Sequence, residues 1–353
     1  MNEKTQPCTH CGAVHPRVNL TWMGSAELCP ECLQRYTVCC DCCGERIWMA
    51  NDYGTHYLHL CASCRADNYV TCENCGALIP QEDAHYNDED EAYCDSCYER
   101  GYGGTIHNYS YKPEPIFYGD GPLYLGVELE VDEAGKDNIN AVQALQAFNQ
   151  ENVYGYVKSD GSLNDGFELV THPCTLETHL QQVPWRETLE ALRGMGYRSH
   201  APGTCGLHVH VSRKALGKDV YEQEETIAKL LYIFERFWQE ILRFSRRTES
   251  QINHWAARYG ANGRYACINL TNTDTIEFRV FRGTLKYNTV IATLQFVANL
   301  CRVAISLPEY RIQEFSWPAL IEALTQDNCP ELVQYLKERN LYVNEPVTAE
   351  REV

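Results

Sequence analysis

The chain has 353 residues, of which 44% are hydrophobic, and a formal net charge of -18 at pH 7. This composition is typical of a globular protein with at least one full-sized core, and it excludes a disordered chain. The negative charge and the lack of a Lys/Arg-rich tract argue against a general nucleic-acid-binding protein. No apolar run approaches the length of a membrane span, and the N-terminus lacks the features of a secretory signal, so we expect a cytoplasmic location.

The first hundred residues contain an internal repeat of cysteine pairs. Fourteen of the nineteen cysteines precede residue 98, and three CxxC pairs followed by glycine are each answered by a second CxxC pair after 17, 17 and 18 residues. This pattern indicates metal thiolates in a reducing compartment rather than disulfides. The repeat predicts three tandem zinc-ribbon modules over residues 1–100, with ligands Cys8, Cys11, Cys29 and Cys32; Cys40, Cys43, Cys61 and Cys64; and Cys72, Cys75, Cys94 and Cys97.

The second module leaves one choice of ligands open, because Cys39 could pair with Cys42, or Cys40 with Cys43. The second choice places the first cysteine of successive modules 32 residues apart and puts a glycine after Cys43, as in the other two modules. We therefore favour Cys40 and Cys43. Cys39 and Cys42 are then alternative ligands or free thiols beside the site.

Four thiolates close a zinc site, so these three zinc ions are expected to be structural and to supply much of the folding free energy of each small module. Residues 1–105 contain 6 Lys/Arg and 16 Asp/Glu, and each tetrathiolate site adds negative charge. Protein binding is therefore a better prediction than nucleic-acid binding. The aromatic residues that are candidate anchors for a protein partner, or small local cores, are Trp22, Trp48, Tyr53 and Tyr57.

Residues 101–122 are rich in Gly, Tyr and Pro and are predicted to connect the modules to a second domain over 123–310, which a helical extension over 311–353 follows. The periodicity of this region predicts an α+β fold whose strands pair antiparallel. In chain order it predicts a strand at 123–131, a helix at 138–150, strands near 153–158 and 166–170, and a helix at 176–195. A long helix at 219–247, flanked by strands at 206–212 and 275–281, a helix at 286–306 and two short C-terminal helices follow.

Three of these strands place chemically similar side chains on one face. Because side chains alternate across a strand, "GVELEV", "HVHV" and "TIEFRVF" each direct polar residues to one side and aliphatic residues to the other. A sheet that faces water would explain any one of these strands. The three together, however, carry side chains that bind cations and anions, which indicates an active site rather than a solvated surface. The pairs that share a face are Glu128 with Glu130, His208 with His210, and Glu277 with Arg279.

Carboxylates with an imidazole suit Mg²⁺ or Mn²⁺, while Arg279 and Arg282 offer forked donors to phosphate oxygens. These are the parts of a phosphoryl-transfer site, in which positioning and charge neutralisation do most of the catalysis. The sequence has no GxxxxGK[ST] loop and no GxGxxG motif, so the nucleotide-binding loops of P-loop NTPases and protein kinases are excluded.

Four motifs in this order resemble the amidoligase family, which is related to glutamine synthetase and glutamate-cysteine ligase: "GVELEV", "SDGSLNDGFELVTHP", "CGLHVHVSR" and "YACINLTNTDTIEFRVFRGTL". The resemblance covers about residues 123–305. It implies a curved antiparallel sheet with flanking helices that holds ATP and two or three divalent ions. It also implies that a carboxylate is activated as an acyl phosphate before an amine attacks it.

The resemblance also assigns roles to individual residues. It implies that Glu128, Glu130, Glu168, His208 and Glu277 bind Mg²⁺, that Arg279 clamps phosphate, and that His210 supports the nucleotide or orients His208. It makes Arg264, Asn269 and Arg282 candidates for contacts to the γ-phosphate or the substrate carboxylate, and Asp160 a candidate for the incoming amine.

The sequence thus predicts an ATP-dependent carboxylate-amine ligase that the zinc ribbons target to a protein partner. The alternative is a non-catalytic adaptor whose ligase-like domain only binds nucleotide or peptide. A metallohydrolase built on His208 and His210 is disfavoured, because HxH lacks the HExxH geometry of zinc hydrolases and nearby acids outnumber imidazoles.

Overall fold

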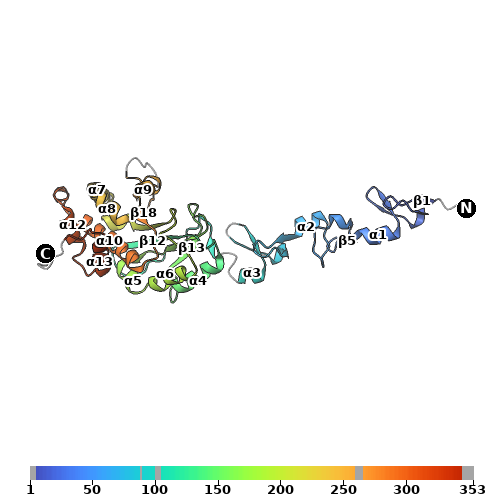
Figure 1. Ribbon diagram of the computed structural model, residues 1–353, viewed down its shortest axis with the longest axis horizontal. Helices are drawn as coiled ribbons and strands as arrows, with labels where there is room; N and C mark the ends of the chain where they lie inside the picture. The colour runs from blue at the N-terminus through green and yellow to red at the C-terminus, as the bar shows by residue number, and fades with distance from the viewer. Residues whose placement is uncertain (1–4, 88–89, 100–104, 259–264, 344–353) are drawn as a thin grey trace, which may run out of the picture. The chain divides into compact units, whose positions relative to one another are not determined.

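The structure is a computed structural model that describes residues 5–87, 90–99, 105–258 and 265–343 (Figure 1). The chain divides into two compact units, Met1–Gly104 and Thr105–Val353. The first unit carries all three cysteine modules, and the second carries the predicted polar strands. Each unit is described by itself below.

The first unit repeats one small motif three times, in which a two-stranded hairpin precedes a short helix. The elements are β1 (Thr5–Pro7), β2 (Val14–Pro16), β3 (Thr21–Met23), β4 (Ala26–Leu28) and α1 (Pro30–Tyr36); β5 (Thr37–Cys39), β6 (Arg46–Trp48) and α2 (Ala62–Asn68); and β7 (Tyr69–Thr71), β8 (Leu78–Pro80), β9 (His85–Tyr86), β10 (Ala92–Tyr93) and α3 (Asp95–Glu99).

Each module has only a small apolar core, which consists largely of its own cysteines. Leu28 and Leu60 are the fully buried aliphatic residues of the first and second cores, and Trp48 of the second module packs against the core of the first. Cores of this size cannot offset the entropy of ordering about 30 residues. The fold of this unit therefore depends on what the cysteines bind.

The second unit is built on one eight-stranded sheet, ordered β11-β13-β14-β12-β16-β18-β17, with β15 paired to β12. Its strands are β11 (Ile106–His107), β12 (Tyr124–Val131), β13 (Gly155–Lys158), β14 (Phe167–Thr171), β15 (Cys174–Thr175), β16 (Gly206–Ser212), β17 (Ile268–Asn269) and β18 (Thr275–Arg282). All pairs are antiparallel except β11 with β13.

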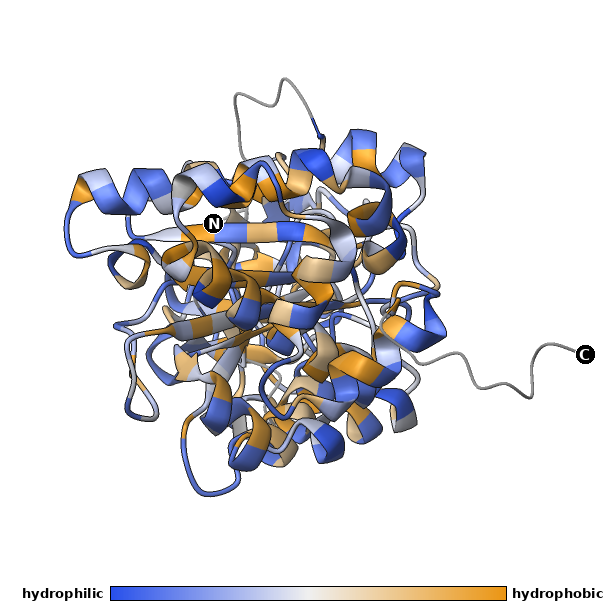
Figure 2. Ribbon diagram, turned by 90° about the vertical axis from the view of Figure 1, so that its left-hand side faces the viewer, coloured by the Kyte–Doolittle hydropathy of each residue, from blue (hydrophilic) through white to orange (hydrophobic). Residues whose placement is uncertain are grey.

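Helices cover the sheet and close the core. They are α4 (Asn138–Phe148), α5 (Leu176–Gln181), α6 (Trp185–Gly194), α7 (Val220–Arg236), α8 (Trp238–Ser245), α9 (Glu249–Trp255), α10 (Tyr287–Ser306), α11 (Glu309–Ile312), α12 (Trp317–Leu324) and α13 (Pro330–Glu338). Figure 2 shows helices that carry both hydrophilic and hydrophobic residues, as amphipathic helices do.

Helix α10 is the central helix of this core and contacts α5, α6, α7, α12, α13 and β16. By length and composition alone it could span a membrane, contrary to the sequence analysis, which identified no apolar run of that length. In the structure 78% of its most apolar window is buried by the rest of the chain. Its hydrophobicity is that of a core helix.

The structure departs from the sequence prediction at several points. The sheet is not strongly curved, and the predicted single helices over 176–195 and 219–247 are each two helices, interrupted at Pro184 and Phe237. Pro184 has no N–H to continue a helix, which explains the first break. The short elements β11, β15, β17, α9 and α11 were missed, because two-residue strands and helices of four or seven residues show too little periodicity.

The segments flanking the predicted second domain belong to the same unit. From Thr105 the predicted connector adds β11 to the sheet edge, and Ile106 is buried in the core. The predicted C-terminal extension contributes Leu320 and Leu332 to that core through α12 and α13.

Asp132, directly after β12, fixes the loop that precedes β14. Its carboxylate accepts hydrogen bonds from the backbone N–H groups of Glu133, Asn164 and Asp165 at 3.0, 3.1 and 2.7 Å, and from the Thr204 hydroxyl at 3.0 Å. Burial alone would raise the pKa of Asp132, but these donors outweigh it and lower the pKa. The buried Asp132 carboxylate therefore holds in place the 159–165 loop, which lies far from Asp132 in the sequence.

We predict that Asp132→Ala destabilises the 159–165 loop and the adjacent strand β14 by about 3 kcal/mol at pH 7, because several buried donors lose a charged acceptor. Hydrogen exchange of these segments measures the opening free energy, with zinc content as a control for the first unit. Since the native pKa is lowered, the difference between wild type and variant should shrink as the pH falls below the ordinary value of 3.8 and through the native value. Unchanged exchange at pH 7 would contradict this role.

Candidate functional site

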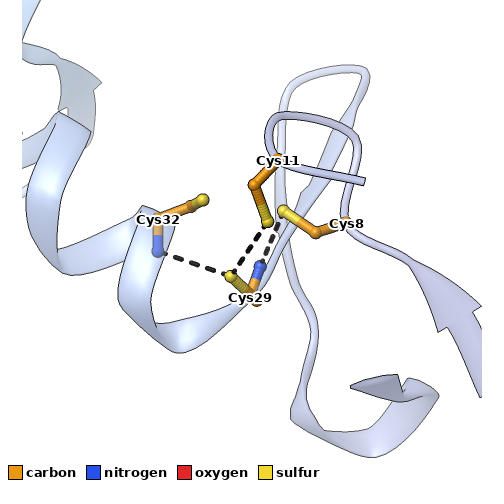
Figure 3. A group of neighbouring side chains, drawn as sticks. All are labelled: Cys8, Cys11, Cys29 and Cys32. Atoms are coloured by element: carbon orange, nitrogen blue, oxygen red, sulfur yellow. Dashed lines mark hydrogen bonds between the residues drawn. The ribbon is translucent and has the colours of Figure 1, made fainter. Parts of the chain in front are cut away.

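The twelve predicted zinc ligands converge in three groups in the first unit. In each group the four sulfur atoms lie within 4.8 Å of one another. Figure 3 shows Cys8 and Cys11 from the hairpin turn facing Cys29 and Cys32 at the start of α1. The groups are Cys8, Cys11, Cys29 and Cys32; Cys40, Cys43, Cys61 and Cys64; and Cys72, Cys75, Cys94 and Cys97.

The sulfur spacing fits zinc. A tetrahedron with Zn–S bonds of about 2.3 Å has sulfur atoms about 3.8 Å apart. The Sγ–Sγ distance is 3.9 Å between Cys11 and Cys29, and 3.8 Å between Cys43 and Cys61. The glycine after each first pair has a positive φ, 73° at Gly44, as the tight turn around the ion requires.

The second group contains Cys40 and Cys43, and excludes Cys39 and Cys42. Backbone N–H groups of Cys43 and Cys61 point at the Cys40 sulfur and lower the pKa of this thiol to about 6, which favours the thiolate that zinc needs. Cys39 and Cys42 are both exposed. The repeat register therefore identified the group that the structure assembles.

The second candidate site lies on one face of the eight-stranded sheet. Pairing places Glu130 opposite Glu168, Glu128 opposite His208, and His210 opposite Glu277. On the other face, alternating residues such as Val127 and Leu129 are fully buried in the core. We call the chemically polar side of this sheet the polar face and define it by Lys158, Glu168, Glu128, Glu130, His208, His210, Glu277, Arg279 and Asn269.

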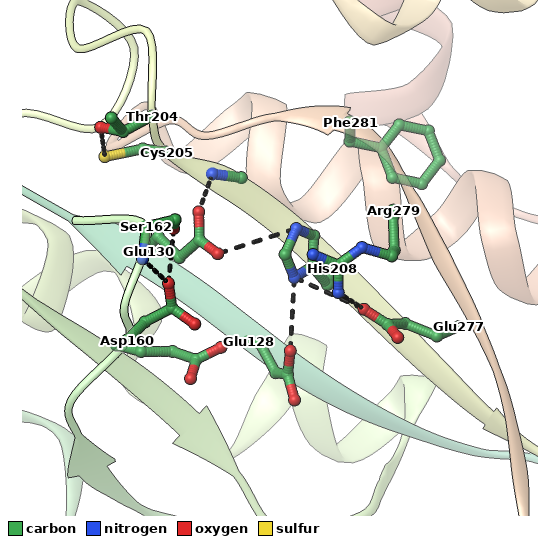
Figure 4. Close-up of polar contacts among 12 residues, drawn as sticks. Glu128, Glu130, Asp160, Ser162, Thr204, Cys205, His208, Glu277, Arg279 and Phe281 are labelled. Carbon is green, nitrogen blue, oxygen red and sulfur yellow. Dashed lines mark hydrogen bonds and ion pairs between the residues drawn. The ribbon is translucent and has the colours of Figure 1, made fainter. Parts of the chain in front are cut away.

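Glu128 lies between two imidazoles. Its Oε2 is 3.3 Å from Nδ1 of His208, and its Oε1 is 3.2 Å from Nε2 of His210. The Glu277 carboxylate approaches the same two rings, at 3.5 Å from Nδ1 of His208 and 4.0 Å from Nε2 of His210. Figure 4 shows His208 among the carboxylates of Glu128, Glu130 and Glu277. The two oxygens of Glu128 are thus placed to serve two neighbouring positions.

Two groups on the polar face have ligand atoms close enough to hold one cation each. One consists of Glu128, Glu168 and His208, and the other of Glu128, His210 and Glu277. Carboxylate oxygens joined by an imidazole suit Mg²⁺ or Mn²⁺. Glu130 belongs to neither group, and its Oε2 accepts the backbone N–H of Gly206.

Protons and cations compete for these carboxylates. Burial and the nearby Glu128 charge raise the pKa of Glu168 well above its usual range, although Lys158 at 3.5 Å opposes the rise. Burial would also raise the pKa of Glu128, but the charge of His210 and the contacts with His208 hold it well below its usual range. Protonation of Glu168 and binding of a divalent cation are therefore two alternative ways to relieve the repulsion between these carboxylates.

The Arg279 side chain lies next to these carboxylates. Arg279 forms an ion pair with Glu277, and the Asn269 amide donates to the other oxygen of Glu277 at 2.8 Å. Burial alone would lower the pKa of Arg279, but the opposing charge of Glu277 outweighs it and raises the pKa. The Nε atoms of Arg279 and Arg282 are buried without a hydrogen-bond partner among the described residues. Two arginines thus retain donors for a ligand.

Of the remaining predicted residues, Asp160 lies beside Glu130 and accepts hydrogen bonds from the N–H and hydroxyl of Ser162 at 2.7 and 2.5 Å (Figure 4). Arg264 lies outside the described residues. Sequence reasoning missed Lys158, Asp132 and Arg247. A Tyr-x-Lys alternation in β13 could have indicated Lys158, but no local pattern identifies the other two.

A cavity of about 360 Å³ lies elsewhere in the second unit, where α6 and α13 meet the start of α10. The polar face contributes no side chain to its lining. Two of its charged groups are already partnered, since Arg186 stacks over the Tyr287 ring at 4.0 Å and Lys286 pairs with Glu338 at 2.9 Å. The chemistry of the polar face therefore identifies the better candidate active site.

Comparison with known proteins gives a family match within the second unit that includes Glu130, Glu168, His208 and His210, but not Glu128, Glu277 or Arg279. Residues 129–262 match the model of a family described as "putative amidoligase enzyme". No curated protein matches the chain. The family match confirms the resemblance seen in the motifs and indicates an enzyme of the ligase type, while the three cysteine groups fit zinc ribbons.

We predict that the chain binds three zinc ions and that Cys40→Ser releases one of them, while the matched variant Cys39→Ser retains all three. The reason is that Cys40, and not Cys39, belongs to the four-sulfur group. Native mass spectrometry counts the bound ions. Loss of zinc from Cys39→Ser with retention in Cys40→Ser would reverse the ligand assignment.

We also predict that the polar face binds two Mn²⁺ ions and that Glu128→Gln impairs both sites, whereas Glu168→Gln impairs one. Glu128 belongs to both groups and Glu168 to one. Mn²⁺ titration followed by electron paramagnetic resonance gives the number of sites, and a change at the exposed Glu177 of α5, Glu177→Gln, is the control. Equal losses in the Glu128 and Glu168 variants would exclude a shared carboxylate.

Proposed function

We propose that the second unit is an ATP-dependent carboxylate-amine ligase that forms an amide or isopeptide bond through an acyl phosphate, in a fold related to glutamine synthetase and glutamate-cysteine ligase. The observation that carries this proposal is Glu128, whose two oxygens face two imidazoles and can serve two cations. A cation pair next to arginines is what a polyphosphate requires for binding and charge neutralisation.

The side chains on the polar face would divide the work as follows. Divalent cations, when bound, would neutralise the phosphate oxygens and orient the transferred group. Glu277 is held by Asn269 and Arg279, so its free lone pairs have a fixed direction toward the cations. The free Nε donor of Arg279 would contact the phosphoryl group as it moves from ATP to the substrate carboxylate.

The incoming amine needs a negatively charged binding position and a proton acceptor. Asp160 is a candidate for both roles, because the backbone and hydroxyl of Ser162 hold one of its oxygens and Asp132 anchors its loop. An ammonium group placed there would give up its proton before attacking the acyl phosphate. The acyl carbon would then gain the amine and lose inorganic phosphate.

The zinc modules support a targeting role in this proposal. Their residues are strongly acidic, and several apolar side chains are open to solvent, including Val18, Trp22 and Tyr57, which are 86%, 62% and 91% exposed. Such anchors favour a protein partner over nucleic acid. Because thiolate ligands need reducing conditions, a cytoplasmic location is part of the same proposal.

We predict that the chain releases ADP from Mg-ATP in the presence of pooled carboxylates and amines, and that Glu277→Gln lowers this rate at least about 100-fold. The variant weakens one cation site and releases Arg279 from its ion pair. Coupled ADP assays give the rate, and mass spectrometry identifies a joined product. Glu177→Gln should retain the wild-type rate, and zinc content should be equal in all three proteins.

Other outcomes would select other functions. Binding of Mg-ATP by calorimetry without ADP release would favour the adaptor alternative. Zinc on the polar face with peptide hydrolysis in the absence of ATP would favour a metallohydrolase. Failure to bind any nucleotide would contradict the ligase proposal.

A further inference from the structure

Arg247 is a buried arginine that reaches the polar face from outside the sheet. It follows α8 and precedes Thr248, the N-cap of α9. The preceding residue, Arg246, has a φ of 65°, so the chain turns sharply at this point. The Arg247 residue is only 6% exposed. A side chain of this length is therefore directed into the protein rather than toward solvent.

The guanidinium of Arg247 is incompletely paired. Its NH2 group donates to the carbonyl of Phe281 at 3.3 Å, and its Nε and NH1 atoms are buried without a hydrogen-bond partner in the described part of the chain. No carboxylate within this part lies within ion-pair distance of it; the nearby Glu130 instead lies 3.9 Å from Nε2 of His208. Burying a charged group with free donors is costly, so such a group normally has an anionic partner.

Gly206 makes room for this guanidinium at the end of the polar face. A Cβ atom at Gly206 would lie 2.3 Å from Nε2 of His208 and 3.0 Å from NH2 of Arg247. The absence of a side chain at Gly206 therefore lets His208 and Arg247 approach the same strand position. Since His208 belongs to a candidate cation group, Arg247 lies near a cation position as well.

The charges around Arg247 also favour an anion. Burial lowers the pKa of Arg247 to about 10; the Glu130 carboxylate opposes this shift, while the positive charges of Arg279, Arg246 and Arg282 add to it. The Nε atoms of Arg279 and Arg282 are unpartnered among the described residues, like that of Arg247. Several like charges with free donors repel one another until an anion lies among them.

We infer that Arg247 and Arg279 form an oxyanion subsite at the Gly206 end of the polar face, next to the cation group of His208. The ligand class is a phosphoryl group or a carboxylate, which share the charged oxygens that guanidinium donors recognise. This inference deepens the proposed ligase function and rests on it for the source of the anion. The presence of the subsite can be tested without ATP turnover.

The test uses the full zinc-loaded chain with Mg²⁺ and measures binding of inorganic phosphate by calorimetry. We expect Arg247→Gln to weaken phosphate binding about tenfold or more, and Arg247→Lys to restore part of it, because a lysine keeps the charge but not the planar donors. Arg302→Gln, an exposed change toward the C-terminal end of α10, should bind phosphate as the wild type does. Acetate is titrated in the same way as the carboxylate probe.

Gly206→Ala provides a second variant in case Arg247→Gln does not fold. The added methyl group would displace His208 and Arg247, so phosphate binding should fall while Arg247 is still present. Selective weakening of acetate binding would assign the subsite to the substrate carboxylate, and selective weakening of phosphate binding would assign it to the transferred group. Unchanged binding of both probes in the folded Arg247 variants would overturn the inference.

These results separate the subsite from the proposed activity. Phosphate binding that depends on Arg247, in a chain that releases no ADP, would retain the subsite and reject the ligase. ADP release with an unchanged KM for ATP and unchanged probe binding in Arg247→Gln would retain the ligase and reject the subsite.

Discussion

The constraint on which the second unit depends is the burial of several carboxylates on one face of a sheet. Glu130, Glu168 and Glu277 are nearly inaccessible to solvent, and Glu128 lies beside them on the central strand. Carboxylates this close cannot all be ionised unless positive charge compensates them. Without it, at least one of them takes up a proton. The opposite pKa shifts of Glu128 and Glu168 express this competition, and the imidazoles and arginines around them supply the available positive charge.

The sheet produces this arrangement through register. Antiparallel pairing brings Glu128 opposite His208, and a register shift between Leu207 and Val209 adds an extra residue of β18 opposite His208. A bulge of this kind re-aims side chains beside it. Alternation along β18 directs Glu277 and Arg279 to this same face, where the two side chains form an ion pair.

The first unit solves a different problem, which is how modules without a sizeable core can fold. Each repeats a turn with a positive-φ glycine and a helix that begins at the second cysteine pair, so that four sulfurs meet. The binding free energy of a metal ion held by these four sulfurs would then replace the missing hydrophobic contribution.

The sequence by itself determined whatever depends on local periodicity. The 32-residue repeat selected Cys40 over Cys39, and strand alternation placed Glu128 with Glu130 and His208 with His210, because both patterns can be counted along the chain without knowledge of the fold. Only the tertiary structure decided which carboxylates share an imidazole, that Asp132 anchors the Asp160 loop, and that Arg247 from a helix junction reaches Gly206. These contacts join segments far apart in the chain, and their partners are set by strand register and helix packing, which no local pattern encodes.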